Sequence, residues 1–488
     1  MIGTSLHEYI FIRLCILCLL LVNPLSMVYL LGCCIRGRVL ISPILVAFCA
    51  AEVAFFLFVY LPRKKRLQKP VSSPPDLSLE RRHVLFSRCA KYITHAGAAA
   101  FPTGWFLSSS SASRLTRENV REWLLWAFFH ATRQEYLPEW TEEIEHYIDA
   151  VEDILGRKLE EGNKEGTKPM RITLDPVTSV HRPLVWYALV ALVDQCTAVR
   201  LLSRGFRHYS PRQWFKVFPP RPHTLASRAS VVQNMSYWYF SGTSTNAKPP
   251  IVFIHGLGIG LYPYVPLLVE LVARDRSRPV VVIELLPISM RITAPLPPRA
   301  VVVSSIATIL DSLSIERFVL ATHSYGTVVS AHILDSPLNA RVTDCLMIDP
   351  IPFLLHLPDV AYNFWYRPPV RANEWQLWYF ASRDPDISRC IGRSFFWADN
   401  ILWREDVEAF VRDGERHFAV VLSEADQIVN SRAVHRYLTG EEHPSFHWTG
   451  FNGNLEVLFY KGLDHATVMD TKARRSPMLD ILTRFGTS

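Results

Sequence analysis

The sequence predicts an α/β fold for residues 236–488, in which a mostly parallel sheet carries helices on both faces. Over these residues, short apolar segments of strand character alternate with helical stretches, as in chains that build a parallel sheet. The preceding residues 70–235 have a mostly helical pattern, and residues 1–69 hold two long apolar runs. We therefore expect three parts: a membrane anchor, a helical region and an α/β domain.

The composition allows a large core and argues against a general nucleic-acid-binding function. The chain has 488 residues, of which 49% are hydrophobic, so two or three folded domains fit its length. Its formal charge is +7, but a basic cluster at residues 63–69 supplies five of these charges and leaves +2 for the rest. A general surface for nucleic acid is therefore not indicated.

The nine cysteines do not form a recognisable metal or disulfide pattern. Five lie within the first 49 residues, inside apolar runs, and the others are scattered singly. The odd count and the lack of a complete set of zinc-ligand spacings argue against a disulfide framework or a zinc site. We expect no metal, no cofactor and a reducing compartment for the main domain.

The N-terminus reads as one or two transmembrane helices. Residues 14–35 carry no formal charge, and residues 39–61 carry one, Glu52. Each run can cross a hydrocarbon core of roughly 30 Å as a helix. A signal peptide would have a shorter apolar stretch and a cleavage site, whereas here a second apolar run and a basic cluster follow. Asn23-Pro24 and Glu52 leave re-entrant or interfacial helices as alternatives.

The charges around the two runs predict an orientation. Lys and Arg accumulate on the cytoplasmic side of short flanking segments. The five basic residues at 63–69 outnumber Arg36 and Arg38 between the runs. Two spans would then place both the N-terminus and the large C-terminal part in the cytosol, at the endoplasmic reticulum or another internal membrane.

The helical region gives no sign of chemistry. We expect helices at residues 117–131, 142–159 and 183–202, of which the last is apolar enough to be buried or to lie at a membrane surface. The pattern favours a helical layer packed against the α/β domain.

The α/β domain places its most informative residues where strands end. The expected strands are 237–240, 251–254, 280–284, 318–322, 345–348, 417–422 and 455–459, with helices at 299–313 and 431–438. Open α/β sheets bind ligands at the carboxyl ends of their strands. Reactive side chains are therefore expected in the segments that follow these strands.

Residues 318–329, FVLATHSYGTVV, read as a strand, a tight turn and a helix, with Ser324 at the turn and Gly326 two residues later. This is the layout of a nucleophile elbow, which lifts a serine Oγ above the sheet edge. The N–H of Tyr325 would face an oxyanion at the start of the helix. The motif usually has a glycine two residues before the serine, and this sequence has Thr322 at that position. The alternative interpretation is a buried serine at an ordinary strand–helix corner.

A glycine turn follows the strand at 251–254. In His255-Gly256-Leu257-Gly258, the glycines allow the backbone to turn sharply and to direct an N–H inward. We assign this second oxyanion donor to Leu257, with Gly258 as the neighbour that could share it. His255, Gly256 and Gly258 then support this turn, as Gly326 supports the elbow.

A histidine and two carboxylates could complete a catalytic set. His465 follows the last expected strand, in Lys461-Gly462-Leu463-Asp464-His465. Asp426 follows the penultimate strand and Asp349 follows the strand after the elbow. Either carboxylate could orient the imidazole and stabilise its protonated form, and either could instead cap a helix. The order serine, acid, histidine holds with both.

Residues 236–488 resemble the α/β-hydrolase superfamily, with the HG turn, the elbow and the terminal histidine in family order. The resemblance implies that Ser324 attacks an ester-type carbonyl and that His465 is first general base and then general acid. It favours Asp426 over Asp349 as the acid, because the loop after the penultimate strand is the commoner family position. The N-terminal anchor and the segment 349–353 are similar to uncharacterised membrane-associated hydrolases of fungi.

An insertion at residues 350–412 sits where this family often places a cap. It holds 14 aromatic residues in 63, about 22% against 12% for the whole chain. An aromatic cap over a serine site favours an apolar acyl or lipid-like substrate. The sequence thus predicts a membrane-anchored serine hydrolase of lipophilic esters. An acyltransferase or thioesterase, or a catalytically inactive scaffold on the same fold, is the alternative.

Overall fold

The computed structural model describes residues 2–70, 77–92, 102–107, 115–162, 166–243 and 248–486. Within these residues, ten strands form one sheet in the order β2-β1-β3-β5-β4-β6-β7-β8-β10-β9. The strands are β1 (Arg207–Ser210), β2 (Arg228–Ala229), β3 (Ser236–Phe240), β4 (Ile251–Ile254), β5 (Val280–Glu284), β6 (Phe318–His323), β7 (Val342–Ile348), β8 (His417–Ser423), β9 (His447–Gly450) and β10 (Leu455–Tyr460).

The centre of the sheet is parallel, as the sequence predicts. Strands β5, β4, β6, β7, β8 and β10 pair in parallel, whereas β3 is antiparallel to β5 and to β1, and β9 is antiparallel to β10. Every residue of β4, β5, β6 and β7 is buried. Parallel strands covered on both faces are near-continuous apolar runs, which is why the sequence made them visible.

Three strands were not expected from the sequence, and all three lie towards an edge of the sheet. β1 and β2 extend the sheet with residues from the helical region, and β9 pairs only with β10. β1 is polar, and β2 has two residues. Such segments lack the run of apolar residues that identifies a buried strand.

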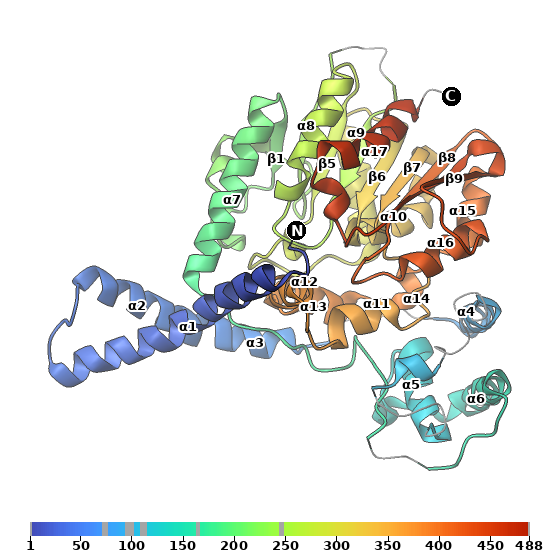
Figure 1. Ribbon diagram of the computed structural model, residues 1–488, viewed down its shortest axis with the longest axis horizontal. Coiled ribbons are helices and arrows are strands. Elements are labelled where there is room, and N and C mark those ends of the chain that lie inside the picture. The colour runs from blue at the N-terminus through green and yellow to red at the C-terminus, as the bar shows by residue number, and fades with distance from the viewer. Residues whose placement is uncertain are drawn as a thin grey trace.

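Helices cover both faces of the sheet (Figure 1). One face packs against α8 (Val265–Arg274), α17 (Lys472–Arg484) and the inner side of α7 (Leu184–Ser203). The other packs against α9 (Arg299–Ser312), α10 (Tyr325–Leu334), α15 (Arg404–Val411) and α16 (Ser431–Thr439). The fold class expected from the sequence is therefore confirmed.

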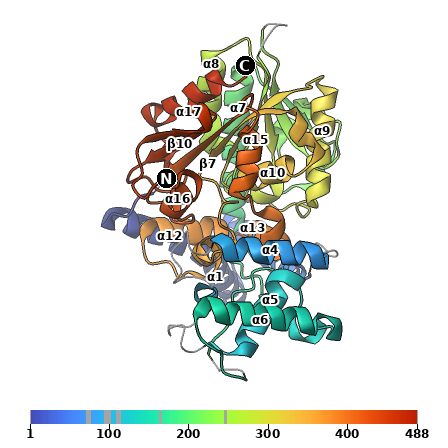
Figure 2. The same ribbon diagram turned by 90° about the vertical axis from the view of Figure 1, so that its right-hand side faces the viewer.

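The cap lies between β7 and β8 and rests on the helical region. Its helices are α11 (Asp359–Ala361), α12 (Ala372–Leu377), α13 (Pro385–Ser394) and α14 (Trp397–Asn400). Beside it lie α4 (Leu79–Tyr92), α5 (Arg117–Phe129) and α6 (Thr141–Leu155), seen below the α/β body in Figure 2. The indole of Trp397 donates to the carbonyl of Ala127 at 2.8 Å, which joins cap and helical region through a buried hydrogen bond.

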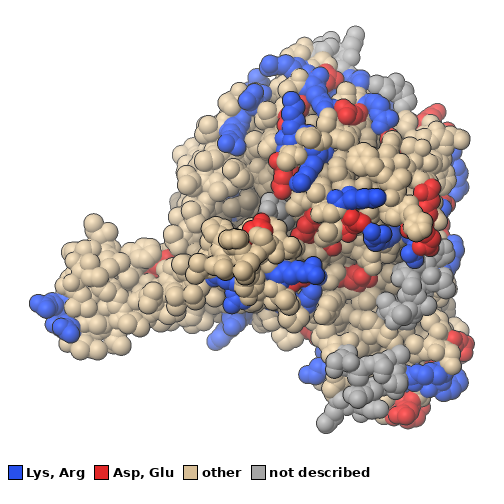
Figure 3. Space-filling model, viewed as in Figure 1, with Lys and Arg blue, Asp and Glu red and all other residues tan. Residues whose placement is uncertain are grey.

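At the N-terminus, α1 (Leu6–Arg36) and α2 (Pro43–Phe55) form a hairpin that projects from the body (Figure 1). α2 continues through a π-helical turn, Phe56–Tyr60, into α3 (Leu61–Leu67). Among the described residues, three helices are long and apolar enough to cross a membrane: Leu6–Arg36, Pro43–Leu67 and Leu184–Ser203. The projecting arm is tan along most of its length in Figure 3, with Lys and Arg gathered at its tip.

The N-terminal helices pack against the cap, which the sequence did not indicate. Ile12 and Ile16 of α1 are buried against Ala372 and Tyr379 of the cap. Arg63 of α3, from the basic cluster, forms an ion pair with Asp386 on α13, whose side chain is 7% exposed. Residues 1–69 therefore contribute to the packing of the cap as well as forming the projecting hairpin.

Candidate active site

Ser324 occupies a strained turn between β6 and α10. Its backbone has φ 51° and ψ −123°, a positive φ that costs energy in residues other than glycine and that clusters at functional sites. Its N–H donates to the carbonyl of Ile348 at 3.0 Å, and its own carbonyl accepts the N–H of Thr327 at 2.8 Å. These hydrogen bonds hold the turn that the motif predicts.

Two glycines allow this turn to lie close to its neighbours. A Cβ on Gly326 would lie 2.3 Å from the carbonyl oxygen of Ile254, and one on Gly256 would lie 2.7 Å from the Cβ of Ser324. Both distances are far below van der Waals contact, so neither position accepts a side chain without displacement of the backbone. The elbow and the turn after β4 are therefore packed directly against each other.

Thr322 replaces the usual first glycine of the motif without leaving a polar group unpaired. It is fully buried, and its Oγ1 is hydrogen-bonded to Oγ of Ser330 at 2.8 Å. Ser330 lies on α10 and is itself small, which leaves room for the branched side chain. The elbow geometry thus accommodates the departure from the glycine pattern.

A continuous chain of hydrogen bonds links Ser324, His465 and Asp426. Nε2 of His465 lies 2.9 Å from Oγ of Ser324, and Nδ1 lies 2.7 Å from Oδ2 of Asp426. Ser324 and His465 are buried, at 5% and 6% exposure. The second oxygen of Asp426, Oδ1, accepts the N–H groups of Ile428 and Val429 at 2.7 and 3.0 Å. The carboxylate is thereby fixed with one oxygen towards the imidazole.

Asp349 also lies near His465 but is bonded differently. Its Oδ1 accepts the N–H of Ser423 at 3.1 Å, and its Oδ2 accepts the N–H of Ala466 at 2.7 Å. Nε2 of His323 lies 3.6 Å from the same Oδ2. Asp349 thus joins the loop after β8 to the loop after β10, whereas the ring of His465 is hydrogen-bonded to Asp426 and Ser324.

The surroundings of His465 favour its protonated form. Burial by itself lowers the pKa of the imidazole, but the charge of Asp426 and its hydrogen bond outweigh this and raise the pKa of His465 to about 9. Burial raises the pKa of Asp426, and the adjacent imidazole opposes that change. For Asp349, burial also acts to raise the pKa, but His323, His465 and the N–H of Ala466 bring it below the ordinary value.

The predicted oxyanion donors lie on the turn after β4 and at the start of α10. Leu257 and Tyr325 both line the small cavity beside Ser324. The N–H of Gly258 donates to the carbonyl of Ile288 at 3.1 Å, so it is already engaged, and this distinguishes Leu257 from its neighbour. His255 braces the turn, because its Nε2 accepts the N–H of Leu285 at 3.0 Å.

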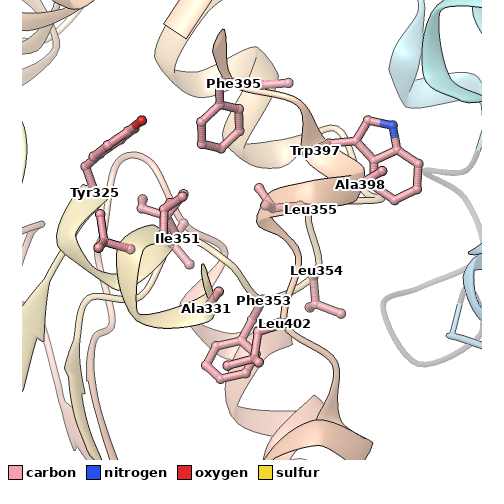
Figure 4. Packing of buried hydrophobic residues seen from close by; sticks show 14 of the residues in the cluster. Tyr325, Ala331, Ile351, Phe353, Leu354, Leu355, Phe395, Trp397, Ala398 and Leu402 are labelled. Carbon is pink, nitrogen blue, oxygen red and sulfur yellow. The ribbon is translucent and has the colours of Figure 1, made fainter. Parts of the chain in front are cut away.

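The cavity beside Ser324 is apolar and small. Its volume is about 40 Å³, and it is lined by Ile172, Leu257, Ser324, Tyr325, Ile351, Val360, Ala361, Phe364, Trp365, Ile391, Phe395 and Ile428. Figure 4 shows Phe395 and Ile351 on the side of the cap next to Tyr325. Ile172 comes from the helical region and was missed by the sequence analysis, since a lone isoleucine carries no functional signal.

Asp349, Asp426 and His465 also have the proximity of a metal site, with ligand atoms within 4.8 Å of one another. However, both oxygens of Asp349 accept backbone N–H groups, and Asp426 accepts two N–H groups and bonds to His465. These oxygens already have hydrogen-bond donors. This arrangement suits the orientation of an imidazole better than the binding of a cation.

No family model matches the chain, and no curated protein matches its sequence. Solved structures with related folds include a bacterial membrane phospholipase A, at 12% identity over 62% of this chain and 94% of that chain, with a TM-score of 0.39. Naproxen esterase from Bacillus subtilis is 15% identical over 60% and 98% of the two chains, with a TM-score of 0.37. A carboxylesterase of the thaumarchaeon Nitrososphaera gargenis is 15% identical over 52% and 97%, with a TM-score of 0.36.

These likenesses are distant, with TM-scores between 0.36 and 0.39, and the finer resemblance to fungal hydrolases finds no support. The architecture of this chain is defined by its own structure. Its features are the strand order, the turn at Ser324 between β6 and α10, and the insertion after β7. The chain has a mostly parallel sheet with helices on both faces, an insertion between β7 and β8, and N-terminal helices long and apolar enough to span a membrane.

Proposed function

We propose that this chain is a serine hydrolase that cleaves an ester-type bond of a lipophilic substrate through an acyl-enzyme intermediate. The observation that carries the proposal is the hydrogen-bond chain from Ser324 through His465 to Asp426 at a strained strand–helix turn. A nucleophile, a base within hydrogen-bond reach and a group that orients the base are the signature of nucleophilic catalysis.

Each residue has a defined part in the reaction. Oγ of Ser324 forms a bond to the ester carbonyl carbon while its proton passes to Nε2 of His465. The negative charge that develops on the carbonyl oxygen is stabilised by the N–H groups of Leu257 and Tyr325. His465 then gives the proton to the leaving alkoxide, which departs as an alcohol. Water attacks the acyl-enzyme by the same route, and the acid is released with Ser324 regenerated.

The lining of the cavity supports an apolar acyl group. Aside from Ser324 and the hydroxyl of Tyr325, its lining side chains are aliphatic or aromatic. A volume of about 40 Å³ holds roughly three waters at 10–15 Å³ each. The cavity is therefore too small for a long acyl chain, and an ester that carries one requires Phe364, Trp365 and Phe395 to move aside.

The membrane part of the proposal rests on the α1–α2 hairpin. The helical stretches that form it, Leu6–Arg36 and Pro43–Leu67, are long and apolar enough to cross a membrane, and most of the large apolar side chains of α1 and α2 are exposed. We propose that the hairpin anchors the protein, with the α/β domain on the cytosolic side of an internal membrane. The full-length protein should then stay in the membrane pellet after carbonate extraction, and release into the supernatant would contradict the anchor.

Labelling with a fluorophosphonate tests the nucleophile. The full-length protein in membranes should label, whereas Ser324→Ala should lose labelling and ester hydrolysis at equal expression. Ser304→Ala, on the exposed side of α9, is the matched control and should label fully. Full labelling of Ser324→Ala would overturn the assignment, and an unlabelled wild type would favour an inactive scaffold. Product analysis with an added alcohol separates hydrolysis from acyl transfer.

A further inference from the structure

Helix α7 carries apolar residues on its exposed face as well as on its buried face. A helix at the surface of a soluble domain turns polar residues to water and apolar residues to the core. In α7 the exposed stripe is apolar as well, with Leu192 at 60% and Val199 at 65% exposure. The stripe comprises Val185, Ala188, Leu189, Leu192, Cys196, Val199 and Leu202. Figure 3 shows the corresponding flank of the body as a largely tan surface.

The charged group in the middle of α7 faces inward. Asp194 is the helix's sole acidic residue, and its carboxylate pairs with Arg221 and Arg291, each at 3.0 Å. Arg221 also binds Glu284 of β5, at 2.7 Å. If α7 crossed a bilayer, this buried network and the sheet edge around it would lie at the level of the hydrocarbon, where charges are costly. Helix α7 is therefore not a spanning helix, although its length and composition would permit it.

The N-terminus of α7 is joined to the base of the hairpin. Glu52 of α2 accepts the N–H groups of Leu184 and Val185 at 3.0 and 3.4 Å, which caps the first turn of α7. The ring of Phe55 lies 5.6 Å from that of Tyr187. From this junction α7 runs up the flank of the body, across the direction in which the hairpin projects (Figure 1). The exposed stripe thus begins where the hairpin leaves the body.

An aromatic loop extends the same surface. Phe218 packs against both Phe55 and Tyr187, with ring centroids 5.7 and 5.2 Å apart. The residues just before it, Trp214 and Phe215, are 44% and 104% exposed. Exposed aromatic residues beside a membrane helix are typical of the water–lipid interface. Arg200, Arg204, Lys216 and Arg212 are exposed around this surface and suit anionic headgroups.

We infer that the exposed stripe of α7, together with Trp214 and Phe215, lies in the plane of the bilayer that the α1–α2 hairpin enters. The partner of this surface is the lipid bilayer itself, with the apolar side chains at the boundary between headgroups and acyl chains. The inference rests on the anchoring part of the proposed function, and it adds the orientation of the α/β body, whose α7 flank faces the membrane.

Spin labels on single cysteines in the full-length protein test this placement. The protein is reconstituted into vesicles of phosphatidylcholine and phosphatidylserine at about 4:1, so that the surface carries the negative potential of an anionic leaflet. The accessible native cysteines at 15, 18, 33 and 34 are replaced by serine. Labels are placed, one at a time, at Leu189→Cys, Leu192→Cys, native Cys196 and Val199→Cys, and Cys196 is also replaced by serine in every variant that is labelled elsewhere. Val28→Cys in the hairpin is the membrane reference, and Thr308→Cys on α9 is the water reference.

The expected result is that all four α7 labels are more accessible to oxygen than to a water-soluble nickel complex. Their depths should be equal along the helix, about 5–10 Å below the headgroup level. A depth that changes by about 1.5 Å per residue would indicate a spanning helix and overturn the inference. Accessibility to nickel equal to that of Thr308→Cys, or protection from both reagents by a protein partner, would also overturn it.

The hairpin reference separates the two proposals. If the Val28→Cys label is membrane-embedded and the α7 labels are not, the anchor stands and the in-plane placement of α7 is wrong. If the Val28→Cys label itself lies in water, the anchoring part of the proposed function fails and the inference fails with it.

Discussion

The decisive perturbation at the candidate site is Asp426→Asn, compared with Asp349→Asn. In the native arrangement, Oδ1 of Asp426 accepts two backbone N–H groups and Oδ2 faces Nδ1 of His465 at 2.7 Å. An asparagine would keep its carbonyl oxygen towards the backbone donors and present its NH2 group to the imidazole. Nδ1 must then accept a hydrogen bond, so that Nε2 carries the proton and cannot take the one from Ser324.

The size of the effect follows from this change of tautomer. The same substitution at the orienting aspartate of a serine protease lowers kcat by about 10⁴. That factor corresponds to about 5 kcal/mol of lost transition-state stabilisation. We expect Asp426→Asn to lose about three to four orders of magnitude in kcat, by analogy with that protease. The variant should remain folded, because both backbone N–H groups keep an acceptor.

Asp349→Asn should behave differently because both oxygens of Asp349 are used to hold loops. The new NH2 group must face either Ser423 or Ala466, whose N–H group then loses its acceptor. An unsatisfied buried donor costs about 1–3 kcal/mol of stability. A shift of the His465 loop by about 1 Å can lower the rate by about 10². The expected outcome is a less stable protein with a rate loss of at most about 10².

Both variants are assayed on one p-nitrophenyl ester, at matched concentrations of folded protein measured by circular dichroism. Thermal unfolding separates the loss of stability from the loss of rate. The reasoning is refuted if Asp349→Asn is the inactive variant while Asp426→Asn keeps most of the wild-type kcat. In that case Asp349 would be the acid that orients His465, and the roles of the two carboxylates would be exchanged.

Three other measurements test the contacts around the site and the cap. Because only neutral imidazole accepts the serine proton, kcat/KM should fall as the pH drops below the raised pKa of His465, about 9; a midpoint at the ordinary value of about 6.5 would contradict this. Trp365→Phe should enlarge the cavity and raise kcat/KM for longer acyl chains relative to acetate esters, and an unchanged chain-length profile would show that Trp365 does not limit the acyl pocket. Arg63→Ala should leave the buried Asp386 unpaired and destabilise the protein by about 3–5 kcal/mol. The control Lys64→Ala, at an exposed position, should not change stability. Equal unfolding midpoints of the two variants in detergent would count against the ion pair.

The sequence was sufficient for features that depend on local pattern. The buried parallel strands are continuous apolar runs, so β4, β5 and β6 were placed within a residue or two. The turn at Ser324 was visible because a glycine is needed two residues later, where a Cβ would lie 2.3 Å from a backbone oxygen. The two apolar N-terminal helices were visible because each is a long apolar run of the length that could cross a bilayer.

The tertiary structure decided everything that depends on contacts between distant segments. Two aspartates follow strands at the same sheet edge, and only the side-chain geometry shows that Asp426 bonds to the imidazole while Asp349 joins two loops. The contribution of Ile172 to the cavity and the packing of α1 against the cap join residues far apart in the chain. Helix α7 has enough apolar residues to span a membrane, and only the partners of Asp194 show which of its faces is inside. Composition records how apolar a segment is, but the direction in which each side chain points is set by what packs against it.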